Sequence, residues 1–468
     1  MCGIAGIFAY RDSAPPVNQE ELLRIREAMI NRGPDGAGLW LSNDNRVGPA
    51  HRRLAIIDLS DTGAQPMATD DGQLRITFNG EIYNYRALRK ELEAKGVRFR
   101  SESDTEVLLH LYADRGMEMV HALRGMYAFG IWDERRKGLF LARDPFGIKP
   151  LYYTNDGATL RFASQVKALA AGGGVNLTSD PAGHAGFYLW GHVPEPFTIY
   201  REVQALPAGT TLWLDRSGRP EVKRYVSIPD IYASAEAAPS RNDAREIKEE
   251  LRRQLLDSVE HHLVADVPVG VFLSSGKDST TLASLAGELE GNLLTITLGF
   301  REFQGTNNDE VPIAEYVARK IGAIHKTIWI GRKDFESGAE RFMAAMDQPT
   351  IDGVNSYFVA KAASDAGLKA ALPGLGGDEL FGGYGDQDKG RMPRNLHYRD
   401  ESIWDRPRRS IPTPNARSVP LSLKWRASIT WPARSFSAAG PGEIFNPRAT
   451  PTSRCCCMVY RVVASTRP

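Results

Sequence analysis

The feature that most constrains the fold of this chain is a change of pattern at residues 227–244, SIPDIYASAEAAPSRNDA. Residues before it are rich in short apolar strands, whereas residues 245–330 alternate between helices and apolar strands. Alternating helices and strands are typical of a parallel sheet with crossover helices. Because 468 residues exceed the size of one usual domain, we expect two domains joined by this polar, proline-containing linker.

Local patterns predict the individual elements. In the first domain we expect strands at residues 2–9, 74–78, 127–132 and 139–142, and an amphipathic helix at 19–30. Residues 51–58 are a basic cluster that runs into a further, β-branched strand. Glu106 follows Ser103 by three residues, which is the spacing of a capping box at a helix start. In the second domain we expect helices at 245–264, 279–289 and 309–322, and strands at 267–273, 293–300 and 325–330.

The composition argues against several classes of protein. A formal net charge of +1, with 42% hydrophobic and 25% charged residues, is ordinary for a soluble globular protein and gives no reason to expect a nucleic-acid or membrane partner. No apolar run is long enough to span a bilayer, and the start lacks the layout of a signal peptide, so we expect a cytoplasmic protein. Four cysteines, three of them consecutive at Cys455–Cys457, predict neither a disulfide framework nor a zinc site.

The remaining cysteine, Cys2, stands directly behind the initiator methionine. If Met1 is removed, one residue carries both a thiol and a free α-amine. Their reference pKa values differ so little that moving the proton from sulfur to nitrogen costs about 1 kcal/mol. One residue then supplies nucleophile and base, as in enzymes with an N-terminal nucleophile. The alternative is an ordinary buried thiol at the head of a strand.

A nucleophilic thiolate needs an amide to attack and donors for the oxyanion that forms. Asn79 and the backbone N–H of Gly80 follow a predicted strand and could form such a hole. Arg53 suits bidentate binding of a substrate α-carboxylate, and Glu81 and Asp104 could hold an α-ammonium. Each residue alone could equally be a turn former, a surface charge or a helix cap.

In the second domain, Ser274–Ser279 (SSGKDS) lies between an apolar strand and a helix. Backbone amides in such a loop, with a helix N-terminus behind them, form a phosphate site. The spacing is not that of a Walker A loop. The alternative is a plain strand-to-helix turn with a serine cap.

Several segments of the first domain resemble the glutaminase domain of glutamine-hydrolysing asparagine synthetases: MCGIAGIF, NRGPDG, HRRLAIIDLSDTGAQPM, FNGEIYNY, SDTEVLLH, LRGMYAFGIWD and LARDPFGIKPLYY. The resemblance implies an α+β N-terminal-nucleophile hydrolase (αββα) fold with Cys2 as nucleophile. It implies an oxyanion site at Asn79 and Gly80. It also implies a glutamine site made of Arg53, Leu54, Ala55, Ile56, Ile57, Asn79, Gly80, Glu81 and Asp104.

The second domain resembles the α/β parallel-sheet, ATP-pyrophosphatase-type half of that family. SSGKDS is similar to the family's SGGxDS loop, with Ser275 where glycine is usual and Lys277 where an aliphatic residue is usual. PGLGGDELFGGY, from Pro373, is similar to its SGEGSDExFGGY segment. The resemblance implies Mg²⁺ at Asp278 and Asp378, and an ATP site lined by Leu273, Ser274, Ser275, Gly276, Lys277, Asp278, Ser279, Leu298, Pro373 and Gly374.

The implied reaction uses glutamine, aspartate and ATP, passes through β-aspartyl-AMP, and gives asparagine, glutamate, AMP and pyrophosphate. Two positions depart from the pattern: Leu375 stands where the family has glutamate, and Asp352 where an arginine would bind aspartate. A carboxylate at the second position would repel an α-carboxylate. These departures leave open an amide ligase that acts on another carboxylate.

The expected domains are a glutaminase domain at 2–210, its end and a linker at 211–244, and an ATP-binding domain at 245–385. Residues 386–468 do not resemble the family's closing helical part, and their bias toward Arg, Pro and Ser predicts a protease-sensitive tail without a core. This tail leaves open a glutaminase without synthetase activity, or a non-catalytic subunit. A homodimer is possible.

Overall fold

The structure is a computed structural model that describes residues 1–237 and 243–377. The predicted magnesium ligand Asp378 and the predicted tail, residues 386–468, lie outside these ranges.

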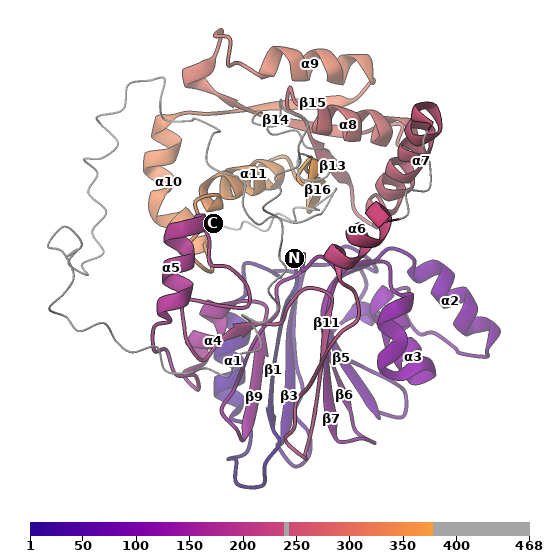
Figure 1. Cartoon of the computed structure of the whole chain (residues 1–468), viewed down its shortest axis with the longest axis vertical. Helices are drawn as coiled ribbons and strands as arrows, with labels where there is room; N and C mark the ends of the chain where they lie inside the picture. Colours follow the sequence, from indigo (N-terminus) through magenta and orange to yellow (C-terminus); the bar gives the residue numbers. More distant parts are fainter. Residues whose placement is uncertain (238–242, 378–468) are drawn as a thin grey trace, which may run out of the picture. The chain divides into compact units, whose positions relative to one another are not determined.

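Two antiparallel sheets form the centre of the first domain, as the αββα prediction requires (Figure 1). The first sheet has the order β10-β8-β9-β1-β3-β2, with β1 Gly3–Ala9, β2 Gly36–Leu39, β3 Val47–Arg53, β8 Tyr152–Asn155, β9 Thr159–Ala163 and β10 Gln204–Ala205. The second has the order β12-β11-β7-β6-β5-β4, with β4 Met67–Ala68, β5 Leu74–Ile82, β6 Gly125–Asp133, β7 Gly138–Arg143, β11 Thr210–Asp215 and β12 Glu221–Arg224.

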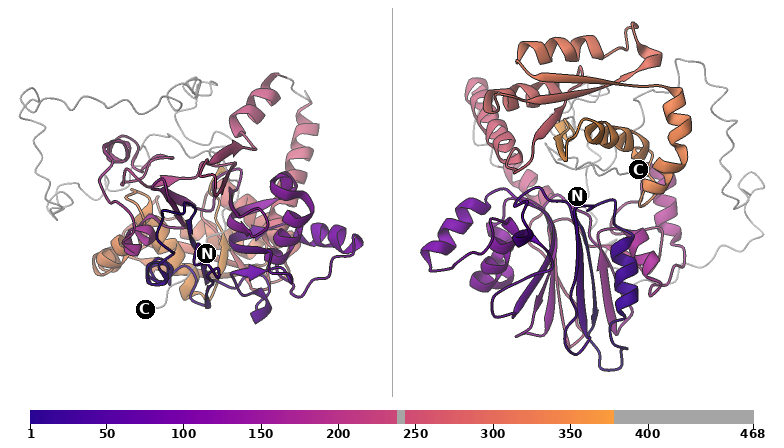
Figure 2. Two further views of the ribbon diagram at one scale, coloured as in Figure 1. Left: turned by 90° about the horizontal axis from the view of Figure 1, so that it is seen from below. Right: turned by 180° about the vertical axis from the view of Figure 1, so that it is seen from behind.

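Helices cover the outer face of each sheet in Figures 1 and 2. Helices α1 (Gln19–Glu27) and α4 (Val166–Gly172) lie beside β1, β3 and β9. Helices α2 (Tyr85–Ala94) and α3 (Asp104–Arg115) lie on the side of β5. The remaining helical segments of the domain are α5 Pro181–Trp190 and two 3₁₀ turns, Asp61–Gly63 and Gly116–Ala122.

Strand β1 shows how the sequence builds these layers. All seven of its residues are buried, and successive side chains point to opposite faces. Ile4 and Phe8 pack between the two sheets with Phe162, whereas Ile7 packs against Leu22 of α1. A strand buried on both faces is a continuous apolar run, which is why CGIAGIFA shows no polar alternation.

The second domain contains a four-stranded parallel sheet with the order β15-β14-β13-β16. Its strands are β13 Val269–Phe272, β14 Leu294–Phe300, β15 Ile324–Ile330 and β16 Ala370–Leu372. Its helices are α7 Ala244–His262, α8 Lys277–Leu289, α9 Val311–Lys320, α10 Arg332–Ala345 and α11 Gly353–Asp365, with a 3₁₀ turn at Arg301–Phe303. The predicted parallel sheet with crossover helices is confirmed. Between the domains, residues 228–237 of the expected linker form α6, Ile228–Ala237.

Three local predictions were wrong. The strand expected within residues 51–58 lies earlier, at Val47–Arg53, so its basic residues are in the sheet and Leu54–Asp58 leave it. Asn79-Gly80-Glu81 lie within β5 rather than after it. The capping box does not form: Ser103 caps α3 by accepting a hydrogen bond from the Thr105 N–H, but the Glu106 carboxylate binds the N–H groups of Arg100 and Ser101 instead.

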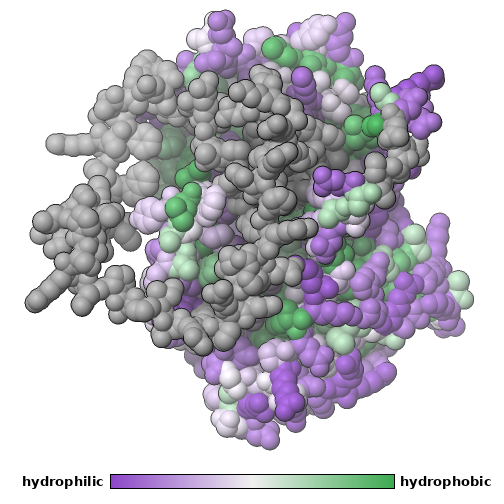
Figure 3. All heavy atoms as spheres, viewed as in Figure 1, coloured by the Kyte–Doolittle hydropathy of each residue, from purple (hydrophilic) through white to green (hydrophobic). Residues whose placement is uncertain are grey.

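Most of the coloured surface in Figure 3 is hydrophilic, with small hydrophobic areas between the polar ones. Within the described ranges, no helix has the length and apolar character needed to cross a membrane.

A buried carboxylate organises the turn after β7. Asp144 is fully buried, and its two oxygens accept hydrogen bonds from four backbone N–H groups: Tyr127 at 3.2 Å, Phe146 at 3.0 Å, Ile148 at 2.9 Å and Lys149 at 2.9 Å. A buried donor left without an acceptor costs about 1–3 kcal/mol. Asp144 therefore holds the turn from β7 to Lys149 together with Arg143, whose guanidinium donates to the carbonyl oxygens of Lys149 at 2.8 Å and Gly147 at 2.7 Å.

We expect Asp144→Ala to lower the free energy of unfolding by about 3 kcal/mol or more, because two buried N–H groups, of Tyr127 and Lys149, and two partly buried ones lose their acceptor. Denaturant unfolding followed by tryptophan fluorescence measures the change. Asp12→Ala is the control, because the Asp12 side chain is 100% exposed and its removal should change stability by less than about 0.5 kcal/mol. Equal midpoints for both variants would contradict this role.

Candidate active site

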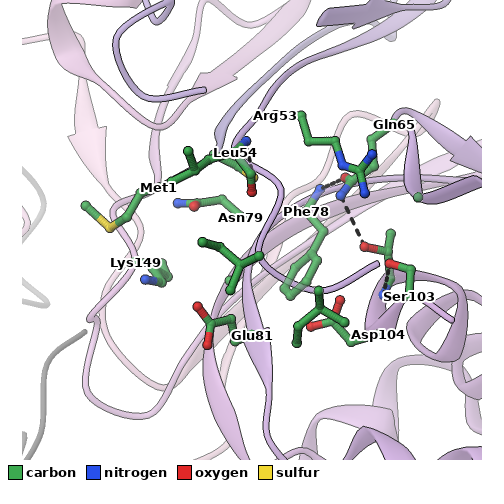
Figure 4. Close-up of a pocket in the computed structure, with 16 residues that line it drawn as sticks. Met1, Arg53, Leu54, Gln65, Phe78, Asn79, Glu81, Ser103, Asp104 and Lys149 are labelled. Carbon is green, nitrogen blue, oxygen red and sulfur yellow. Dashed lines mark hydrogen bonds between the residues drawn. The ribbon is translucent and has the colours of Figure 1, made fainter. Parts of the chain in front are cut away.

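One pocket in the first domain brings together most of the predicted glutamine-site residues (Figure 4). Of the predicted set it is lined by Cys2, Arg53, Leu54, Ile56, Ile57, Asn79, Gly80, Glu81 and Asp104. Ala55 is not part of the lining; its backbone N–H donates to Asp35 Oδ2 at 2.9 Å. Residues that the sequence analysis did not select also line the pocket: Met1, Gly63, Gln65, Phe78, Ser103, Thr105 and Lys149.

Cys2 lies just before β1, and the sheet determines its surroundings. The Leu54 N–H donates to Cys2 Sγ at 3.3 Å, and the thiol faces the Leu54 carbonyl oxygen at 3.6 Å. Arg32 Nε donates to the Cys2 carbonyl oxygen at 3.0 Å. Burial raises the pKa of the Cys2 thiol, while the nearby N-terminal ammonium, the Leu54 N–H and the charges of Arg53 and Arg32 act in the opposite direction.

The α-amine at the chain start lies in the same pocket. Burial lowers its pKa well below the usual 8.0, and the positive charges of Arg32 and Lys149 lower it further. A neutral amine accepts a proton, whereas an ammonium cannot. In the structure this amine belongs to Met1; removal of Met1 transfers the free amine to Cys2, next to the sulfur.

Asn79 presents an unusual buried amide to the pocket. It is 1% exposed, and neither its Nδ2 nor its Oδ1 has a hydrogen-bond partner within residues 1–237 and 243–377. Buried polar groups are nearly always paired, so such an exception needs an explanation. Asn79 lies on the same face of β5 as Thr77, which contacts β3 of the other sheet. Its amide therefore faces the space beside Cys2, where a ligand would satisfy it.

Gly80 allows the close approach of two strands. A Cβ at this position would lie 2.2 Å from the Met126 carbonyl oxygen and 2.7 Å from Tyr127 Cα. Any larger residue would push β5 away from β6 and displace Asn79.

The Arg53 guanidinium is oriented by backbone carbonyl groups. Nη1 donates to the Ser60 oxygen at 2.7 Å, and Nη2 donates to the Asp58 oxygen. A guanidinium positioned in this way is ready to bind a planar carboxylate with its remaining donors.

Two buried carboxylates, Glu81 and Asp104, lie across the pocket from Arg53 in Figure 4. Asp104 accepts a hydrogen bond from the Ile82 N–H at 3.0 Å. Burial, with a further contribution from the Glu81 charge, raises the pKa of Asp104 to about 7. A cation between these two carboxylates would favour their ionised forms, so the pocket matches a zwitterion with its carboxylate at Arg53.

Gln65 and Lys149 are the informative residues that sequence reasoning missed. Gln65 joins two walls of the pocket, accepting from the Phe78 N–H at 2.7 Å and donating to Thr105 Oγ1 at 3.1 Å. Lys149 is only 2% exposed, although lysine is rarely buried. Both residues occur in segments that carried the resemblance, GAQPM and PFGIKP, and that was the one available signal.

The predicted nucleotide residues lie at the carboxyl ends of β13 and β16. After β13 the chain adds β14 and β15 on one side of β13 in the sheet. It then crosses to the other side of β13, where it forms β16. In open parallel sheets, ligands bind outside the strand ends at such a switch point. Ser274–Ser279 follow β13, and Pro373 and Gly374 follow β16. Leu273 is buried directly before the loop, and Leu298 lies on the neighbouring β14.

The two loops approach each other so closely that only glycine fits. A Cβ on Gly374 would lie 2.9 Å from the Ser279 nitrogen, and one on Gly377 would lie 2.1 Å from an Asp278 carboxylate oxygen. Helix α8 begins at Lys277, and its N-cap residue, Gly276, provides no side-chain cap. This leaves the first turn of α8 open to an anionic group.

Within the described ranges, no group of three or more His, Cys, Asp or Glu side chains is arranged to hold a metal ion. Asp278 lies in the first turn of α8, and its predicted companion Asp378 lies outside those ranges. Of the two departures from the pattern, Leu375 is 47% exposed, and Asp352 is an exposed residue at the start of α11.

Both halves of the chain match known protein families. Residues 1–226 match the family model of the glutamine amidotransferase domain, and residues 250–437 match that of asparagine synthase. A putative glutamine-hydrolysing asparagine synthetase 2 of Methanocaldococcus jannaschii is 33% identical over 411 residues, which cover 82% of this chain and 76% of that protein. The chain belongs to the glutamine-hydrolysing asparagine synthetase family.

Other members of the asparagine synthetase family match over similar ranges. Asparagine synthetase 1 of Bacillus subtilis is 38% identical over 387 residues, covering 82% of this chain. The chain spans only 59% of the length of that relative. A putative asparagine synthetase of Mycobacterium tuberculosis H37Rv is 35% identical, covering 97% of this chain and 72% of that protein.

The raised pKa of Asp104 predicts a cost to stability that depends on pH. Native Asp104, with a pKa of about 7 against an ordinary 3.8, binds its proton more tightly than the unfolded chain does. The stabilisation that this tighter proton binding gives the folded state is therefore fully present below pH 3.8 and is lost as the pH rises through 7. Without glutamine, we expect Asp104→Asn to be more stable than the unmodified protein at pH 8 by on the order of 2 kcal/mol, and equally stable near pH 4.

Denaturant unfolding at both pH values measures this difference. Asp70→Asn is the matched control, because the Asp70 side chain is 77% exposed and should show no such pH dependence. A stability difference that does not change with pH would contradict the titration of Asp104.

Proposed function

We propose that this protein makes asparagine from aspartate, with glutamine as the nitrogen donor and ATP as the energy source. The observation that carries the proposal is the unpartnered buried amide of Asn79 in the same pocket as Cys2. A buried amide without a hydrogen-bond partner weakens the empty protein. The same amide can donate a hydrogen bond to the negative oxygen that forms when the nucleophile attacks, and so stabilise the transition state.

Glutamine binding follows from the charges of the pocket. Arg53 would take the α-carboxylate, and Glu81 and Asp104 would take the α-ammonium. This places the side-chain carboxamide toward Cys2 and Asn79. Because Asp104 has a pKa of about 7, its ionised form, which binds the ammonium, becomes more populated as the pH rises through neutrality.

The hydrolytic step uses two groups of Cys2, the α-amine and the thiol. Its α-amine accepts the thiol proton, and the sulfur forms a bond to the carboxamide carbon. Asn79 Nδ2 and the Gly80 N–H would stabilise the oxyanion. When the C–N bond breaks, the ammonium returns the proton to the leaving nitrogen, and ammonia departs. Water then cleaves the thioester, which yields glutamate and restores the thiol.

The second domain would bind ATP at Ser274–Ser279, with Leu273, Leu298, Pro373 and Gly374 around the nucleotide. The open first turn of α8 and the glycine-dependent contact between the two loops fit a polyphosphate. Mg²⁺ held by Asp278 and Asp378 would neutralise phosphate charge. Lys277 adds a positive charge at the same helix start. We place the protein in the cytoplasm; a homodimer remains a prediction.

A second candidate is an amide ligase that acts on a carboxylate other than aspartate. The aliphatic side chain of Leu375 cannot transfer a proton, and Asp352 would repel an α-carboxylate. A chain that hydrolyses glutamine but has no synthetase activity is the third candidate. The acceptor-dependent release of AMP separates these candidates.

The decisive experiment compares the unmodified chain with Cys2→Ala in an assay with ATP-Mg²⁺ and aspartate. We expect Cys2→Ala to lose glutamine-driven asparagine synthesis while it keeps synthesis from added ammonia, because the two half-reactions use separate sites. Intact-mass spectrometry should show that Met1 is absent. A retained Met1, or release of AMP only with another carboxylic acid, would overturn this assignment.

Replacement of Asn79 tests the oxyanion site separately. We expect Asn79→Ala to lower kcat for glutamine hydrolysis about 10²- to 10³-fold with little change in KM, since this donor acts mainly on the transition state. Asn18→Ala provides the control: Asn18 caps α1 with its side chain and lies outside the pocket, so kcat should stay unchanged. An equal loss in both variants would point to stability rather than catalysis.

A further inference from the structure

Two residues of the ATP-binding domain lie at the amino ends of neighbouring strands. Asp266 contacts Leu54–Asp58, the supporting segment of the glutamine pocket, and Lys369 contacts Asp35, which binds that segment. Asp266 lies three residues before β13, and Lys369 lies directly before β16. These strands pair in parallel, with Val269 opposite Ala370. Both contacts therefore come from one edge of the sheet, opposite the edge that carries the nucleotide loops.

Asp266 makes two hydrogen bonds to the segment Leu54–Asp58. Its Oδ2 accepts from the Asp58 N–H at 2.7 Å, and its own N–H donates to the Ile56 carbonyl oxygen at 2.9 Å. Apolar packing supports the contact, because Val267 and Val269 pack against the core that contains Ile56 and Ile57. Both sides of the contact belong to one compact unit of the chain.

Lys369 reaches the same segment by a separate path. Its Nζ contacts Asp35 Oδ2 at 2.7 Å, and that oxygen also accepts from the Ala55 N–H at 2.9 Å. Leu54, the neighbour of Ala55, donates a hydrogen bond from its backbone N–H to Cys2 Sγ. The ion pair is partly exposed, so it should contribute less than the bonds made by Asp266.

Asp58 is the residue through which Asp266 acts on the pocket. Its φ of +54° lies in the left-handed region, which costs a non-glycine residue about 1 kcal/mol and persists only when neighbours hold it. The Asp58 carbonyl oxygen accepts from Arg53 Nη2. Two hydrogen bonds therefore connect Asp266 with the guanidinium that faces the pocket.

We propose that Asp266 is a positioning residue for Arg53, and that glutamine binding depends on this contact from the nucleotide-binding domain. The role of Arg53 in binding glutamine rests on the proposed function. The contacts from Asp266 through Asp58 to Arg53 do not depend on it. Because β13 carries Asp266 before its amino end and the nucleotide loop after its carboxyl end, one short strand connects the two sites.

The test uses full-length Asp266→Ala, Asp266→Ser and Asp266→Asn. Alanine removes the acceptor, and the serine hydroxyl is one atom too short to replace it. Asparagine keeps an oxygen that can accept from the Asp58 N–H. Asp257→Ala is the matched control: Asp257 on α7 pairs with Arg124 of the first domain, but neither residue touches the pocket or its supporting segment.

We expect Asp266→Ala and Asp266→Ser to raise KM for glutamine about tenfold with kcat within about twofold, the size expected for a lost hydrogen bond. Asp266→Asn and Asp257→Ala should stay within about twofold of the unmodified protein. A KM that is unchanged in alanine and serine variants, or raised equally in Asp257→Ala, overturns the proposal. The serine variant keeps the test decisive if the alanine variant does not fold.

Hydrogen exchange of the peptide that covers residues 54–60 gives a readout without glutamine. The Asp58 amide should exchange at least tenfold faster in Asp266→Ala and Asp266→Ser than in Asp266→Asn and Asp257→Ala. If the unmodified chain fails to hydrolyse glutamine while this pattern appears, the proposed function is wrong and the contact stands. Unchanged exchange in an active enzyme overturns the contact alone.

Discussion

The antiparallel pairing of β1 with β3 is the constraint on which the site depends. In this register Gly3 lies opposite Arg52, so Cys2 comes next to Arg53 and Leu54. A slip of one residue would turn every side chain of β1 to the other face. Such a slip would bring a side chain to a position where only glycine fits, because a Cβ at Gly6 would lie 2.3 Å from the Phe162 ring. Packing therefore places the Cys2 thiol beside the Arg53 guanidinium, the two groups that the proposed reaction needs together.

A buried polar contact aligns the two sheets with each other. Thr77 Oγ1 on β5 donates to the Ala50 oxygen of β3 at 3.1 Å and contacts His51 Nδ1 at 3.1 Å. Burial lowers the pKa of His51 to about 3, so the ring stays neutral between the sheets at physiological pH. Asn79 lies two residues after Thr77 on the same face of β5. The contact between Thr77 and β3 therefore helps to position the Asn79 amide in the pocket.

Several buried polar groups in the pocket are in unfavourable surroundings, and a bound ligand would stabilise them. Asn79 lacks a partner in the described part of the chain, Asp104 is buried with a raised pKa, and burial lowers the pKa of the N-terminal amine. Each would weaken the empty protein. Together with Arg53, these groups fit the proposed substrate, which carries an α-carboxylate, an α-ammonium and a carboxamide.

Much of the architecture could be predicted because it follows local pattern. The parallel sheet of the second domain was visible as alternating helices and strands, and residue type identified Cys2, Arg53 and Asn79 as chemical candidates. Residues 54–58 do not form the strand that their apolar, partly β-branched sequence predicts. In the fold they leave the sheet, Leu54, Ile56 and Ile57 line the pocket, and Asp266 and Asp35, which are distant in sequence, bind the backbone N–H groups of Asp58 and Ala55.

The sequence by itself determined the two domains, the order of their elements and the reactive groups, because periodicity and residue chemistry are local properties. Only the tertiary structure decided which groups meet. Lys149 enters the pocket because Asp144 binds the backbone of its turn, and the Glu106 carboxylate accepts from the N–H groups of Arg100 and Ser101 in place of its expected partner. Contacts of this kind depend on strand register and packing between distant segments, which no window of sequence contains.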